Sequence, residues 1–162
     1  MQFATLAAFA ASASAMAVAP RQQNQAQYIN GFQAACVPHS TFCNYKFGAS
    51  SQPGVIPPST CSAMVQGPDM LPAVADQSGC KVGNTTNGAY HWSVAKTQEG
   101  GLDFELWYPL NSRSNISFCY DIPAKDLVVD NNGAVQTQRY TGPQYFKMDV
   151  CPLEKAQKNN RN

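Results

Sequence analysis

The sequence predicts an all-β fold, a single antiparallel β-barrel or β-sandwich stapled by disulfides. About eight short runs alternate apolar with polar residues, and turn-forming residues separate them at roughly the 8–12-residue spacing of such folds. No segment after the apolar N-terminus shows the periodicity of an amphipathic helix. Six cysteines in a chain of 162 residues supply the material for three disulfides.

The clearest element is a hairpin over residues 89–108. The apolar residues that share a side are Tyr90, Trp92 and Val94 in its first arm and Leu102, Phe104 and Leu106 in its second. Asp103 and Glu105 fall on the opposite side, and two glycines lie in the link between the arms. Because both tryptophans of the chain lie here, and large rings dominate burial, we expect this hairpin to carry the middle of the core.

The first twenty residues have the pattern of a secretory signal peptide, apolar and then rich in small residues. No Lys or Arg precedes the apolar run, which is too short to span a bilayer. Cleavage after Ala17 fits the A-x-A rule. Cleavage after Ala19 also fits, but it would leave Pro20 at the new N-terminus. We therefore predict a secreted, extracellular protein.

Four parts follow from this pattern. We predict a signal peptide at 1–17, a flexible N-terminal arm rich in Gln and Asn at 18–31, a disulfide-stabilised all-β domain at 32–152, and a disordered tail at 153–162 that lacks apolar anchors. Within the domain, two strands at 32–47 are joined by a turn at 38–41. Asn-Gly at 132–133 predicts a hairpin turn between two later strands.

All six cysteines lie in the mature part, and we expect them to form three disulfides: Cys36, Cys43, Cys61, Cys80, Cys119 and Cys151. Six cysteines allow 15 pairings, and the spacing does not choose among them. No C-x-x-C pair occurs, and His39 and His91 are not at ligand spacing from the cysteines. We therefore expect no metal site and no cofactor. If Ile116, Phe118 and Tyr120 face inward, Cys119 points to the opposite face.

Residues 48–79 hold five of the eleven prolines, so we predict an extended surface loop system there, pinned by cysteines. Such a loop is either a binding region or a passive connection. Its apolar residues would either pack beneath it or form a binding patch: Met64, Val65, Met70, Leu71 and Val74. A second turn-like stretch covers 81–88. Two N-glycosylation sequons, at Asn84 and Asn115, mark expected surface positions.

A net charge of +1 gives no field that would attract nucleic acid. A ribonuclease would use residues of the types found at His39, His91, Glu105 and either Arg113 or Arg139. However, Glu105 alternates on a strand face, and a turn role is favoured for His39. Asp103 and Glu105 point the same way, whereas a glycosidase needs carboxyl groups on opposite sides of the sugar. No nucleophile-elbow, phosphate-loop, dinucleotide or calcium motif occurs. The sequence favours a protein that is not an enzyme and has no catalytic residues.

Four segments, together with the size and the signal peptide, resemble hypersensitive response-inducing proteins, which are secreted elicitors of plant-associated filamentous fungi. The segments are 36–43 (CVPHSTFC), 88–94 (GAYHWSV), 117–121 (SFCYD) and 145–151 (YFKMDVC). The resemblance implies an elicitor or effector that triggers localised cell death and defence responses in plants. Its partner would be a plant cell-surface or apoplastic component. It implies no catalytic residues.

Two alternatives stay open. The chain could be a small secreted hydrolase of ribonuclease or glycosidase type, whose activity provokes the plant. It is also similar, in size, secretion and all-β character, to the β-barrel major allergens of moulds, so a cell-wall or adhesion protein is a further possibility.

Overall fold

The computed structural model describes residues 25–54, 59–82, 85–152 and Lys155. The predicted signal peptide and the sequon residue Asn84 lie outside the described residues. Within them the chain is almost entirely strand. The elements are β1 (Ala26–Cys36), β2 (Phe42–Ser50), β3 (Ser59–Gln66), β4 (Val74–Val82), β5 (Thr85–Lys96), β6 (Leu102–Asn111), β7 (Ser114–Ile122), the 3-10 turn η1 (Ala124–Asp126), β8 (Leu127–Asn132), β9 (Val135–Tyr140) and β10 (Phe146–Val150).

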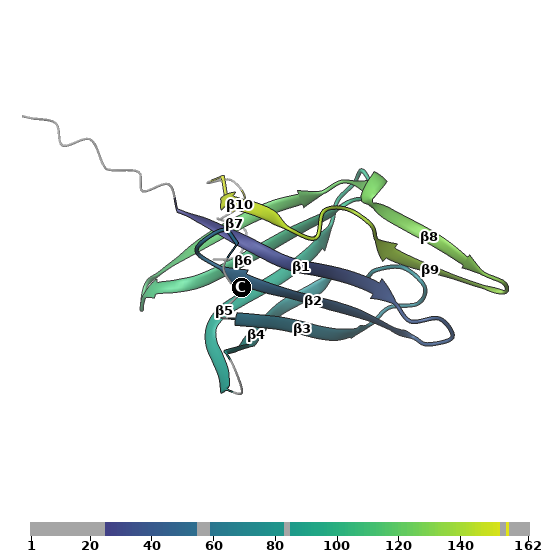
Figure 1. Ribbon diagram of the computed structural model, residues 1–162, viewed down its shortest axis with the longest axis horizontal. Coiled ribbons are helices and arrows are strands. Elements are labelled where there is room, and N and C mark those ends of the chain that lie inside the picture. Colours follow the sequence, from purple (N-terminus) through teal and green to yellow (C-terminus); the bar gives the residue numbers. More distant parts are fainter. Residues whose placement is uncertain (1–24, 55–58, 83–84, 153–154, 156–162) are drawn as a thin grey trace, which may run out of the picture.

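The strands form one antiparallel sheet that curls on itself (Figure 1). From β1 to β7, each strand pairs with the next one in the sequence. β10 then pairs with β7 on one side and with the first residues of β1 on the other. The result is a curled, barrel-like sheet, which confirms the all-β prediction and selects the barrel over the sandwich. The β8–β9 hairpin contacts the end of β1 through Ala35 and Arg139 and projects from the body of the molecule (Figure 1).

Aromatic rings fill the inside of the curl. Phe32 of β1, Phe47 of β2, Trp92 of β5 and Phe104 of β6 are each at most 1% exposed. Their ring centroids lie 5.0–6.4 Å apart, in tilted and edge-to-face arrangements that favour aromatic pairs. The predicted hairpin at 89–108 is therefore confirmed as β5–β6, with its tryptophan Trp92 in the middle of the core.

The predicted N-terminal arm at 18–31 is wrong at its end, because residues 26–31 belong to β1. Gln27 and Ile29 are buried on the inner face, and the Tyr90 hydroxyl donates a hydrogen bond to Gln27 Oε1 at 3.4 Å. The first buried residue of β1 is a glutamine, Gln27. Because the segment is rich in polar residues, its sequence does not have the apolar alternation that would have predicted a strand. The first residues of β1 pair with β10, which lies far along the chain, as well as with β2, the next strand.

The loop predicted over 48–79 is also wrong, because β2 runs to Ser50 and two further strands, β3 and β4, form inside it. Pro68 and Pro72 lie in the link between these strands, where they break no ladder. Likewise, the turn predicted at 81–88 shrinks, since β4 reaches Val82 and β5 begins at Thr85. Pro68 and Pro72 therefore mark the irregular link between β3 and β4, but not a loop over the whole region.

The three expected disulfides form, and each joins residues on neighbouring strands or just beyond one. The pairs are Cys36–Cys43, Cys61–Cys80 and Cys119–Cys151. The first two lie on the buried inner face. Phe118 is fully buried, so Cys119 points to the outer face as predicted, and Cys151 follows directly after β10.

Candidate functional site

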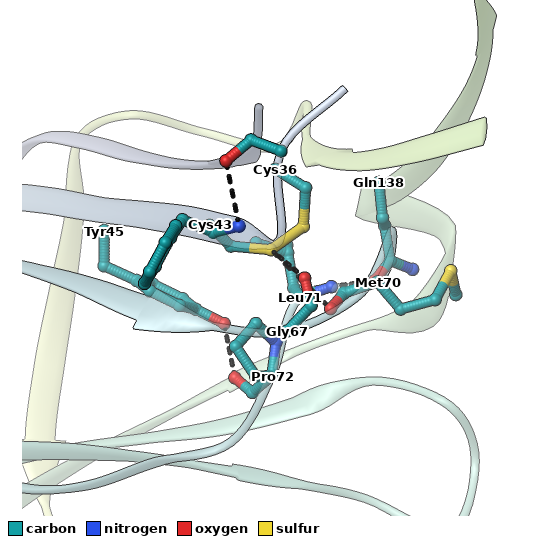
Figure 2. The surroundings of a disulfide bond; sticks show 10 residues. Cys36, Cys43, Tyr45, Gly67, Met70, Leu71, Pro72 and Gln138 are labelled. Atoms are coloured by element: carbon teal, nitrogen blue, oxygen red, sulfur yellow. Dashed lines mark hydrogen bonds between the residues drawn. A yellow bond between two sulfur atoms is a disulfide. The ribbon is translucent and has the colours of Figure 1, made fainter. Parts of the chain in front are cut away.

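The link between β3 and β4 lies against β2, the turn that precedes β2, and β9, and four hydrogen bonds hold it there. In one of them the backbone amide of Gln138 donates to the carbonyl of Asp69 at 2.7 Å. The amide of Gly67 donates to the carbonyl of Thr41 at 2.9 Å. The Tyr45 hydroxyl donates to the carbonyl of Pro72 at 2.7 Å, and the amide of Leu71 donates to Gln138 Oε1 at 3.1 Å (Figure 2). Burial raises the pKa of the Tyr45 hydroxyl, so this group remains a neutral donor.

The Cys36–Cys43 disulfide lies directly beneath this link (Figure 2). Sγ of Cys43 is 3.4 Å from the carbonyl oxygen of Gly67 and 3.7 Å from that of Met70. A disulfide sulfur carries no proton, so these are packing contacts rather than hydrogen bonds. The link therefore packs against a disulfide, and a shift of the link would disturb the β1–β2 hairpin.

The apolar residues between Met64 and Val74 divide into a buried set and an exposed set. The sequence leaves open whether they pack beneath a loop or form a binding patch. Leu71 and Val74 are buried, and Val65 packs against the core. Met64 is 67% exposed and Met70 is 43% exposed. Part of the region therefore packs beneath the link, and part faces solvent.

Two more exposed apolar residues belong to the same end of the molecule. Val37 and Phe42 flank the β1–β2 turn, where the amide of Val37 donates to the carbonyl of Phe42 at 3.0 Å. Phe42 and Met64 share the outer face of β2 and β3, since Phe42 is aligned with Gln66, two residues from Met64. We call Val37, Phe42, Met64 and Met70 the hairpin-end surface.

His39 lies in the β1–β2 turn, as expected, and is exposed with φ = 61°. Few side chains adopt this left-handed conformation, which suits histidine better than a β-branched residue. The turn accounts for its presence without a catalytic role. Asp69, in the β3–β4 link, has the same φ of 61°.

His91 has a different environment, on the outer face of β5. Its Nδ1 lies 3.0 Å from Oδ1 of Asp76 on β4, and its ring stacks on Trp107 of β6 with centroids 5.6 Å apart. A carboxylate that orients an imidazole is one part of a general-base arrangement. Sequence pattern did not point to Asp76, because the segment that holds it was expected to be a loop.

The ribonuclease set is brought together only in part: His91 and Glu105 are diagonal neighbours on the outer face of β5 and β6, and the other members lie elsewhere. His39 is in the turn that precedes β2, and β3 and β4 separate β2 from β5, which is about 14 Å of strand spacing. Arg139 forms an ion pair with Asp130 on the projecting β8–β9 hairpin. Arg113 lies in the β6–β7 turn, where its amide donates to Asn111 Oδ1.

Asp103 and Glu105, which the sequence pattern makes unsuitable as a glycosidase pair, do point to the same side, since Leu102, Phe104 and Leu106 are buried. Asp103 is aligned with Asp121 of β7, and Nζ of Lys155 lies 2.9 Å and 2.7 Å from the two carboxylates. The Lys155 ammonium lowers the pKa of Asp121. The predicted tail is therefore wrong at Lys155, which docks on the sheet; the rest of 153–162 lies outside the described residues.

Of the two predicted sequon residues, Asn115 is exposed on β7. Across the described ranges, no three His, Cys, Asp or Glu side chains gather as a metal site would require. No helix in the described part of the chain is long and apolar enough to cross a membrane.

No protein-family model, curated protein or solved structure matched this chain in the comparisons. The class of the protein therefore rests on its own geometry, a curled antiparallel sheet with a filled core and three disulfides.

Proposed function

We propose that the chain is a secreted elicitor, recognised by a plant cell-surface or apoplastic component, which triggers hypersensitive cell death and defence responses. The observation that carries the proposal is the hairpin-end surface. One of its four exposed apolar side chains, Met70, belongs to the β3–β4 link, which is in contact with a disulfide and is held by hydrogen bonds to Thr41, Tyr45 and Gln138. An exposed apolar surface held in one conformation loses little entropy when a partner binds it.

Three further points support this function. Three disulfides and no free cysteine among the described residues are consistent with an oxidising, extracellular compartment. Because aromatic rings fill the inside of the curl, recognition would use the outer surface. The four segments that resemble secreted elicitors include Cys36–Cys43, the turn that carries Val37 and Phe42.

Leaf infiltration tests the proposal, with the oxidised protein and its reduced and alkylated form side by side. We expect cell death with the folded form alone. The variant Met64→Lys should weaken the response, whereas the control Leu110→Lys should not, because Leu110 is comparably exposed at 55% but lies at the β6–β7 end. No cell death with the oxidised protein would overturn the proposal.

One observation favours a second candidate, a small secreted hydrolase. The Asp76–His91 pair has the geometry of a general base and the group that orients it. His91→Ala would abolish the plant response if catalysis provokes it. The same variant would leave the response intact if the hairpin-end surface is what the plant recognises.

A further inference from the structure

Among the described residues, one aromatic ring stacks on a tryptophan of the outer face of the sheet. Leu106 is buried, so the next residue, Trp107, points outward from β6. On the β5 side, His91 stacks on its ring at a centroid distance of 5.6 Å and an interplanar angle of 20°. On the β7 side, Trp107 is aligned with Ser117, whose side chain is short, and Cys119 is a diagonal neighbour, so no aromatic ring of the described residues stacks there.

The sequon residue Asn115 lies on that open side. Pro109 is aligned with Asn115 and Trp107 with Ser117, so Asn115 and Trp107 are diagonal neighbours on one face. The Cα atoms of such neighbours lie about 7–8 Å apart. Asn115 is exposed and follows the tight β6–β7 turn, which the Arg113 amide closes by donating to Asn111 Oδ1 at 2.9 Å.

We propose that Asn115 carries an N-linked glycan whose first sugar packs against the open face of Trp107. A pyranose presents C–H groups on its faces, and these pack well on an aromatic ring. The asparagine side chain and the glycosidic bond span the diagonal separation. The inference rests on the secretion assumed in the proposed function, because glycosylation at this sequon takes place in the secretory pathway.

The transfer step balances with a lipid-diphosphate-linked oligosaccharide as the donor. The amide nitrogen Nδ2 of Asn115 loses one proton and forms a bond to C1 of the first sugar. The bond between C1 and the diphosphate oxygen breaks, and the lipid diphosphate leaves with the electron pair. No electrons are gained or lost overall.

The fluorescence of Trp107 can report whether a sugar covers its ring. Of its two tryptophans, Trp92 is 1% exposed, so a small quencher in solution reaches Trp107 far more readily. A sugar on Trp107 should protect it. Enzymatic removal of the glycan should therefore raise the acrylamide quenching constant roughly twofold, since one of the two ring faces is uncovered.

The test expresses the full chain behind an added yeast secretion leader, so that entry into the secretory pathway does not depend on residues 1–17. Peptide mass spectrometry should find a glycan on Asn115. Ser117→Ala, which destroys the sequon but keeps Asn115, should abolish the glycan, and Ser117→Thr should retain it. An unmodified Asn115 in the secreted protein would overturn the inference.

The contact with the ring has its own control. Trp107→Ala should leave the glycan in place but remove any rise in thermal midpoint that the glycan gives the parent protein. Equal quenching before and after glycan removal would show that the sugar does not cover Trp107. Because Ser117→Ala can also be infiltrated into leaves, loss of the glycan and loss of the elicitor response are read separately.

Discussion

Apart from the single Ala35–Arg139 pair that joins the projecting β8–β9 hairpin to β1, the sheet has a continuous wall and two thin seams. In the wall, β5 and β6 are aligned from His91–Trp107 to Lys96–Leu102, and β6 continues against β7 in the same manner. In the seams, the described residues align at one pair between β3 and β4 (Thr60–Lys81) and at two pairs between β7 and β10. The wall holds its strands by long ladders of hydrogen bonds, and the seams do not.

Each seam contains a disulfide. Cys61–Cys80 lies beside the Thr60–Lys81 pair, and Cys119–Cys151 joins β7 to the residue after β10. The strands of the wall carry no disulfide between them. These two disulfides therefore hold neighbouring strands together where few ladder hydrogen bonds do so. The third pair, Cys36–Cys43, lies in a well-paired hairpin and instead supports the hairpin-end surface.

The largest expected effect comes from removing the β7–β10 disulfide. Cys119→Ala with Cys151→Ala should lower the free energy of unfolding by about 4 kcal/mol, because this bond closes the longest of the three loops, with a sequence separation of 32. The matched removal of Cys36–Cys43, with a separation of 7, should cost about 2 kcal/mol. Chemical denaturation measures both, and equal losses would contradict the dependence on loop length.

Removing the other seam disulfide should have an intermediate effect. Cys61→Ala with Cys80→Ala should cost about 3 kcal/mol, given the sequence separation of 19. The ladder between β3 and β4 is too thin to compensate. Amide hydrogen exchange should therefore accelerate in β3 and β4 before it does in β5 and β6. Uniform acceleration over the whole sheet would argue against a local seam.

A smaller effect is expected in the link that crosses the first seam. A Cβ at Gly67 would lie 2.8 Å from Cγ of Pro72, which is closer than real Cβ atoms come. Gly67→Ala should destabilise the fold by about 1–3 kcal/mol and displace the hairpin-end surface. Thermal unfolding measures the first effect and leaf infiltration the second. The control Gly54→Ala has no atom within 4 Å to clash with, although its φ of +71° still adds strain.

The smallest effect concerns the ion pairs that Lys155 makes on the wall. Lys155 lowers the pKa of Asp121, so the ionised carboxylate stabilises the folded state at pH values above the ordinary aspartate pKa. That contribution is lost as the pH falls through the lowered value. Lys155→Ala should raise the pKa of Asp121 and cost less than about 1 kcal/mol at neutral pH, because both groups are largely exposed. An NMR titration of the Asp121 carboxyl group checks the direction, and an unchanged pKa would refute the contact.

Local pattern predicted the strands in which the alternation is regular. The β5–β6 hairpin and β7 were visible because apolar and polar residues alternate strictly there, and Cys119 was placed on the correct face for the same reason. The first residues of β1, and all of β3 and β4, were missed because glutamine or proline interrupts their pattern or lies next to it. The Asp76–His91 pair was missed with them, and so was Gln138, whose partner Leu71 lies 67 residues away.

The sequence by itself determined the fold class, the number of disulfides and the residues of the central core, because strand alternation and cysteine count are local properties. Tertiary structure decided the rest. It chose one of 15 disulfide pairings, joined β10 to both β1 and β7, and left Met64 and Met70 exposed while burying Leu71. These features depend on which strands pair in the folded sheet. The sequence around a residue does not show whether a strand far along the chain will bury it.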